Sequence, residues 1–145
     1  MEPRSSDDTM QAAQDRGAQY ISDEWAQPEN LPLAQAANKS GLSGTTINRG
    51  RHDGRFYALL PPGQTRGRRY PEWQFNLSDP ERLTIVLKAF RDHDASCWVI
   101  HNFMTRPLQA IGAQVPIERI RVVDEPLQPV IDAIRRRYTD EQGAS

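Results

Sequence analysis

The chain has 145 residues, a formal net charge of -1 and only 37% hydrophobic residues, and its mean hydropathy is -0.72. This length predicts one or two small domains, and the low hydrophobic fraction predicts that part of the chain is disordered. The single cysteine, Cys97, excludes a disulfide framework and favours a reducing compartment. No apolar run approaches the ~20 residues that span a bilayer, and no signal peptide is recognisable, so we expect a soluble, cytoplasmic protein without membrane contact.

Charge is unevenly distributed along the chain. Residues 1–19 are polar, acidic and without periodicity, so they are predicted to form a disordered acidic tail. The fold is expected to begin near Tyr20, with Trp25 packing onto it. Residues 49–69 form an arginine stripe opposed by Asp53 alone: Arg49, Arg51, Arg55, Arg66, Arg68 and Arg69. Such a stripe is typical of a DNA contact, because guanidinium groups bind phosphates and guanine in bidentate fashion.

Residues 33–49 have the pattern of a helix-turn-helix. A short Ala-rich helix is predicted from Leu33 to Lys39, and Gly41 can supply the positive φ of a tight turn. We expect Leu42 to fill the corner between the helices. Ser43 is a good N-cap for a second helix through Arg49, with Ile47 facing inward. Two short helices around a glycine-containing turn predict that the second helix enters the major groove of DNA.

The predicted DNA-binding domain covers residues 20–75. Phe56–Leu60 and Arg68–Tyr70 are predicted to pair as a hairpin around Pro61–Gly63, which would form a wing beside the second helix. Threonine can meet a thymine methyl, asparagine suits adenine, and arginine suits guanine, whereas the wing arginines would contact phosphates. The predicted DNA-contacting residues are Ser43, Thr45, Thr46, Asn48, Arg49, Arg51, Arg55, Arg66, Arg68 and Arg69. A plain pair of helices that does not bind DNA is the alternative.

Residues 76–138 have the pattern of a compact bundle of about four short helices. Ser78 and Glu81 have capping-box spacing before the stripe formed by Leu83, Val86, Leu87 and Phe90. A central helix should begin near Ser96 and end at Arg106, because the residue before a proline avoids helical geometry. Pro116 opens a third helix. Asp124 is predicted to cap a fourth helix that reaches Tyr138 and ends in Arg135, Arg136 and Arg137, before a flexible tail at residues 139–145.

No catalytic constellation accompanies these elements. His52, His93 and His101 are far apart in the sequence, and none has a cysteine or carboxylate at ligand spacing. No serine or cysteine lies in a nucleophile motif, and Gly41 and Gly44 belong to no phosphate-binding loop. The sequence therefore predicts a mostly α-helical binding protein that is not an enzyme and needs no metal or cofactor.

The C-terminal half of the chain resembles a known family. Arg68–Phe75, the stripe at Leu83–Leu87, Trp98, Ala110–Ile117 and the closing amphipathic helix together resemble the C-terminal toxin-binding domain of Xre/MbcA/ParS-type antitoxins. Gly112 and Pro116 match the Gly-x-x-x-Pro-hydrophobic segment of that family. Two positions depart from its pattern: Arg106–Gln109 replaces the usual Pro-Asn pair before the glycine, and His101-Asn102 replaces a frequent Leu-Trp.

The resemblance implies an antitoxin of a type II toxin–antitoxin system. Its partner would be a RES-domain toxin that degrades NAD, and the antitoxin would block the cleft that binds NAD. Such proteins also repress their own operon by binding operator DNA, as a homodimer or as a hetero-oligomer with the toxin. The residues expected to bind the toxin are Trp98, Met104, Arg106, Leu108, Gln114, Arg135, Arg136, Arg137 and Tyr138.

Two other functions are compatible with the same pattern. The chain could be a stand-alone transcription regulator whose C-terminal helical domain only dimerises. It could also be an interaction or immunity module that does not touch DNA. A salt-dependent affinity for DNA would separate the interaction module from the antitoxin and from the stand-alone regulator.

Overall fold

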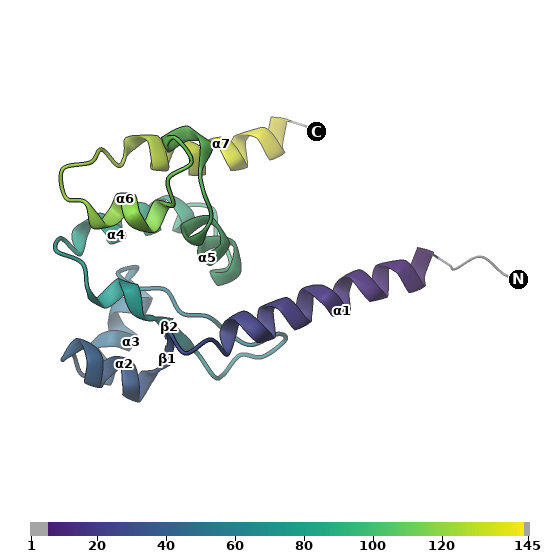
Figure 1. Ribbon diagram of the computed structural model, residues 1–145, viewed down its shortest axis with the longest axis horizontal. Coiled ribbons are helices and arrows are strands. Elements are labelled where there is room, and N and C mark those ends of the chain that lie inside the picture. The colour runs from purple at the N-terminus through teal and green to yellow at the C-terminus, as the bar shows by residue number, and fades with distance from the viewer. Residues whose placement is uncertain (1–5, 144–145) are drawn as a thin grey trace, which may run out of the picture.

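Helix α1 (Ser6–Trp25) opens the computed structural model, which describes residues 6–143. It extends away from the rest of the molecule and meets it near its C-terminal end (Figure 1). Residues 6–19 were expected to be disordered, but they lie in this helix. Residues 1–5 of the predicted tail lie outside the described part. Gln11 and Gln19 each donate a hydrogen bond to an aspartate one turn later, Asp15 and Asp23, at 2.9 and 2.8 Å. Such pairs stabilise an exposed helix, whose polar composition resembles that of a disordered segment.

Strand β1 (Asn30–Pro32) pairs antiparallel with β2 (Arg69–Pro71), with Leu31 opposite Tyr70. The predicted hairpin between Phe56–Leu60 and Arg68–Tyr70 is reduced to one bridge, in which Leu59 and Arg69 exchange two backbone hydrogen bonds of 2.7 and 2.9 Å. A longer ladder cannot form because Pro61 and Pro62 have no backbone N–H. The neighbour of β2 in the sheet therefore comes from the segment that follows α1.

Helices α2 (Leu33–Ser40) and α3 (Gly44–Asp53) are joined by the three-residue turn 41–43. Gly41 has φ +76°, and its N–H donates to the carbonyl of Ala37, which ends α2 as predicted. Ser43 caps α3, since its side chain accepts a hydrogen bond from the N–H of Thr46 over 3.1 Å. Leu42 is 38% exposed and does not fill the corner as expected. Ala36 and Ile47, both fully buried, do so instead.

The remaining elements are helical: the 3₁₀ turn η1 (Glu72–Phe75), α4 (Glu81–Arg91), α5 (Cys97–Thr105), the 3₁₀ turn η2 (Gln109–Ile111), α6 (Pro116–Arg121) and α7 (Gln128–Gly143). Helix α5 begins next to Ser96 and Pro116 opens α6, as predicted, and Ser96 also caps α5 with its side chain. The capping box at Ser78 does not form. Asp79 takes its place and accepts from the N–H of Glu81 over 3.2 Å.

The fourth predicted helix begins at Gln128 rather than at Asp124. Its expected first turn is pulled out of helical geometry because Arg82 binds the carbonyls of Val123 and Glu125, at 3.0 and 2.7 Å. At the other end, α7 continues to Gly143, so the flexible tail predicted for residues 139–145 is wrong up to that residue, and residues 144–145 lie outside the described part.

The main hydrophobic core is built by both halves of the chain. Tyr57, Leu59 and Trp73 lie in the segment predicted to bind DNA, yet they pack in one buried cluster with side chains of α4, α5, α6 and α7. A smaller cluster under α2 and α3 contains Leu31, Ile47 and Tyr70. The proposed division into domains 20–75 and 76–138 stays a prediction, and the core crosses it. Within residues 6–143, no helix is both long enough and apolar enough to span a membrane.

Candidate functional site

The exposed face of α3 is the surface that the sequence assigned to DNA. Thr45 and Arg49 are exposed and stand one turn apart, so their side chains share a face. Ser43 and Thr46 are exposed as well, but their hydroxyls hydrogen-bond to each other over 2.8 Å and serve the helix cap. Thr45 and Arg49 are therefore the predicted residues at this end of α3 whose side chains are best placed to meet a partner.

Asn48 is held by the body of the protein. Its Oδ1 accepts a hydrogen bond from the hydroxyl of Tyr70 over 2.9 Å, and the same hydroxyl accepts from Nε of Arg51 over 3.2 Å. Tyr70 is buried in β2, so this chain of bonds fixes α3 against the small sheet. The side-chain oxygen of Asn48 is therefore already occupied by a bond within the protein.

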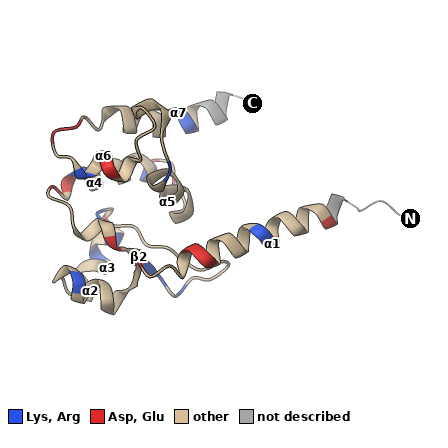
Figure 2. Cartoon of the chain, in the orientation of Figure 1, with Lys and Arg blue, Asp and Glu red and all other residues tan. Residues whose placement is uncertain are grey.

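The arginine stripe divides into two groups. Arg49, Arg55 and Arg66 are exposed, while Arg51, Arg68 and Arg69 are half-buried. Figure 2 shows basic residues on α2, on α3 and beside β2, in the lower part of the molecule. The guanidinium of Arg69 lies 4.0 Å from the ring centroid of Trp25, a cation–π contact that fixes the root of α1. Only the exposed group is fully available to a large polyanion.

Residues predicted to bind a protein partner fall into three environments. Met104 is fully buried in the core, so its assignment to a binding surface is wrong. It belongs to the main core cluster, together with side chains of α4, α6 and α7. Arg106, Arg135, Arg136 and Arg137 are exposed.

The other residues predicted to bind a protein partner are half-buried, and most of them already contact other parts of the chain. Trp98 donates from Nε1 to the carbonyl of Leu60 over 2.9 Å, which ties α5 to the loop after α3. Gln114 accepts from Nε of Arg119 over 2.8 Å. Tyr138 stacks on His93 with ring centroids 4.2 Å apart, and Leu108 packs against the main core.

Two buried polar arrangements were not predicted. Arg82 donates to the carbonyls of four residues of the α6–α7 segment, Arg119, Ile120, Val123 and Glu125, at 2.7 to 3.0 Å. Tyr57, buried in the main core, hydrogen-bonds to both Trp73 and His101. In the sequence, the position of Arg82 directly before the apolar stripe of α4 was the signal that could have indicated the first arrangement. Nothing in the local pattern marks the second.

Burial changes the pKa of two side chains, and the described residues contain no cluster of metal ligands. Burial raises the pKa of the Cys97 thiol and of the Tyr57 hydroxyl, so both stay protonated near neutral pH. Across residues 6–143, no three or more His, Cys, Asp or Glu side chains gather in a way that could hold a metal ion.

Comparison of the chain with models of protein families, with curated proteins and with solved structures finds no match.

Proposed function

We propose that this chain is an antitoxin that represses transcription by binding operator DNA and neutralises a RES-type toxin that degrades NAD. The observation that carries the proposal is the α2–turn–α3 unit, which leaves the Thr45–Arg49 face of α3 exposed, while α4 to α7 form the other, helical part of the molecule (Figure 1). The chain acts by binding rather than by catalysis.

The DNA-binding half of the proposal treats α2 and α3 as a helix-turn-helix. The exposed side chains of α3 enter the major groove, where Arg49 suits guanine and Thr45 suits a thymine methyl. Arg55 and Arg66 lie in the following loop and contact phosphates, which fixes the position of α3 without reading sequence. The Leu59–Arg69 bridge anchors this loop and takes the place of a full wing.

The toxin-binding half rests on the resemblance of residues 68–138 to Xre/MbcA/ParS-type antitoxins. Arg135, Arg136 and Arg137 lie exposed on α7, and Arg106 lies exposed after α5. Guanidinium groups fit a cleft that binds the phosphates of NAD, because they can make paired hydrogen bonds to phosphate oxygens. These arginines are the residues we propose to block that cleft.

The first experiment is growth rescue. A RES-type toxin encoded beside this chain is expressed in a test bacterium with and without the chain, and cellular NAD is followed. A fall in NAD that co-expression reverses supports the proposal. An Arg135→Ala/Arg136→Ala/Arg137→Ala variant should lose the rescue, whereas Arg49→Ala should keep it. Rescue by neither wild type nor variant rejects the toxin-binding half.

The second experiment tests the DNA-binding half by itself. Fluorescence anisotropy with the promoter fragment of the chain's own operon should give an affinity that falls steeply with salt. Arg49→Ala should lower the affinity and relax the preference for that fragment by roughly 1–3 kcal/mol. Arg121→Ala, an exposed arginine on α6, is the matched control. Equal binding by wild type and Arg49→Ala would reject α3 as the recognition helix.

One observation favours a stand-alone regulator as the second candidate. Helix α1 projects from the molecule and exposes Met10 and Tyr20, at 60% and 46%, on a helix that has little contact with the rest of its own chain. A dimer of a transcription regulator would use such a helix. This candidate predicts a homodimer that binds DNA, together with a neighbouring gene product whose toxicity the chain leaves unchanged.

A further inference from the structure

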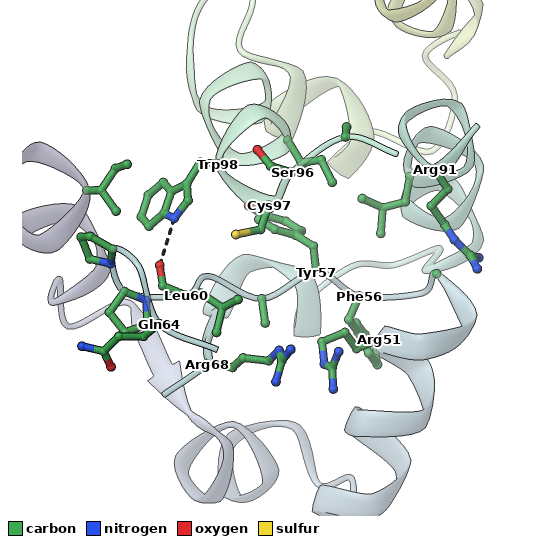
Figure 3. Close-up of a pocket in the computed structure, with 18 of the residues that line it drawn as sticks. Arg51, Phe56, Tyr57, Leu60, Gln64, Arg68, Arg91, Ser96, Cys97 and Trp98 are labelled. Carbon is green, nitrogen blue, oxygen red and sulfur yellow. Dashed lines mark hydrogen bonds between the residues drawn. The ribbon is translucent and has the colours of Figure 1, made fainter. Parts of the chain in front are cut away.

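A cavity of about 570 Å³ lies between α3 and α5, beside the root of α1 and the end of α4 (Figure 3). Its floor is the loop that follows α3, and its roof is the first turn of α5. Cavities of roughly 300–1,000 Å³ are the size that holds small organic molecules in proteins. Three residues that the sequence assigned to DNA or to the toxin, Arg51, Arg68 and Trp98, line this cavity, whereas the side chains used by the proposed function above lie outside it.

The walls of the cavity are largely apolar. Phe56, Leu60, Leu87 and Ile100 line it together with the indole of Trp98. The indole N–H is already bonded to the carbonyl of Leu60 over 2.9 Å (Figure 3), so no indole donor is left for a ligand. Such a lining favours a ligand with an apolar or aromatic body, because it removes that body's surface from water.

The charged groups of the cavity all have one sign. Arg51, Arg68 and Arg91 line it, and no carboxylate does. Figure 3 shows the guanidinium groups of Arg51 and Arg68 directed to the same part of the cavity. Two cations beside an apolar wall without a counter-charge repel each other, and an anion between them would remove that repulsion.

The three arginines differ in whether they already hydrogen-bond to other groups of the protein. Arg91 donates from Nη1 to the carbonyl of Asp53 over 2.7 Å, and Arg51 donates from Nε to Tyr70. Neither interaction supplies negative charge. Among the described residues, Arg68 has neither a hydrogen bond nor an ion pair to a protein group. Arg68 is thus the donor best placed to hold an anionic group, with Arg51 as the second.

We infer that this cavity binds a small organic anion, with an aromatic or branched apolar body among Phe56, Leu60 and Trp98 and one carboxylate or phosphate group on Arg68 and Arg51. The inference goes beyond the proposed function, since it requires neither DNA nor a toxin. Carboxylate and phosphate share the chemistry that a guanidinium recognises, because each can accept paired N–H···O bonds on two oxygens of one group.

The test uses two fluorescent probes of similar shape. Anilinonaphthalene sulfonate has an aromatic body and one negative charge, whereas phenylnaphthylamine has the body without the charge. Wild-type protein should bind the anionic probe saturably, with one site and roughly tenfold tighter than the neutral probe, as one charge-assisted hydrogen bond warrants. Equal affinity for both probes, or binding that does not saturate, would overturn the inference.

Variants locate the site. Arg68→Gln should remove the preference for the anionic probe, and Arg66→Gln should keep it, because Arg66 is exposed outside the cavity and the change in net charge is the same. Thermal unfolding followed by circular dichroism checks that both variants fold. If Arg68→Gln keeps the preference while it lowers affinity for DNA, Arg68 serves a DNA phosphate and the inference fails.

Cys97 supplies a second readout that does not depend on substitution. It is the chain's single cysteine and it lines the cavity, where Figure 3 shows its sulfur facing the interior. Saturating anionic probe should slow its alkylation by N-ethylmaleimide at least several-fold. An unchanged rate would place the probe elsewhere and overturn the inference. Competition of naphthoate and of naphthyl phosphate against the probe then identifies the head group, and displacement by neither would reject both head groups.

Discussion

The hydroxyl oxygen of Tyr57 lies 2.8 Å from Nδ1 of His101, and this contact joins the loop after α3 to the middle of α5. Trp73 donates from Nε1 to the same hydroxyl over 3.2 Å. Because burial raises the pKa of Tyr57, the hydroxyl keeps its proton and donates it to His101. His101 then carries its own proton on Nε2, which lies 3.1 Å from Oε1 of Glu24 on α1. Four separate segments are thereby linked by one chain of hydrogen bonds, which is buried except at Glu24.

Removing the hydroxyl should destabilise the whole protein. Tyr57→Phe leaves Nδ1 of His101 and the indole N–H of Trp73 without partners in the core, which costs about 1–3 kcal/mol of unfolding free energy. Urea denaturation followed by circular dichroism measures the loss. Tyr20→Phe is the control, because Tyr20 is 46% exposed on α1 and its change should be near zero. Equal stability of the two variants would contradict the network.

The same hydroxyl predicts an alkaline effect. Burial raises the pKa of Tyr57 above its ordinary value of 10.0. A raised folded-state pKa means that the stabilisation is complete below the unfolded-state pKa and declines as pH rises above it, because only the unfolded tyrosine ionises. Between about pH 9 and about pH 11, wild type should therefore lose stability more steeply than Tyr57→Phe, by up to about 1.4 kcal/mol per pH unit. Parallel pH profiles of the two proteins would show that Tyr57 ionises normally.

Arg82 should be the arginine whose replacement costs the most stability. Its guanidinium satisfies four backbone carbonyls, and the shorter fork-less side chain of Arg82→Lys cannot reach all of them. We expect a loss above about 2 kcal/mol, because hydrogen bonds to charged groups are worth roughly 1.5–3 kcal/mol each. Arg121→Lys, exposed on the neighbouring helix, should change little. Chemical denaturation of both variants compares them, and similar midpoints would refute the role of Arg82.

Two glycine substitutions should act in opposite directions. Gly54 ends α3 with φ +84°, and a Cβ there would collide with the side chain of Arg91. Gly54→Ala should lower the melting temperature, with a backbone cost of about 1–2 kcal/mol before the collision is counted. Gly17 lies inside α1 with open space around it, so Gly17→Ala should raise the helical circular dichroism signal. A stable Gly54→Ala protein would mean that the end of α3 can rearrange.

Features set by neighbouring residues could be predicted from the sequence. Ser43 and Ser96 cap their helices, Gly41 has the positive φ that its turn requires, and Pro116 begins α6. Each of these depends on the backbone within about four residues, so a short window contains the necessary information. The mostly helical class follows from the same local patterns.

Features set by distant contacts could not be predicted. Met104 was predicted to lie at an interface, and only its place in a core cluster with side chains of α4, α6 and α7 shows that it is buried. The start of α7 is displaced by Arg82, more than forty positions earlier in the chain. Helix α1 has too few apolar residues to give a periodic signal. At the predicted DNA surface, the sequence could not separate exposed Arg49 from Arg51, which Tyr70 holds.

The shared core has a consequence for any attempt to separate the halves of this protein. A fragment beginning after residue 75 would leave its helices facing water where Tyr57, Leu59 and Trp73 now pack. The amino-terminal fragment would expose the same three side chains and would lose His101 as a partner. We therefore expect that neither piece folds by itself and that the intact chain melts in one cooperative transition instead of two.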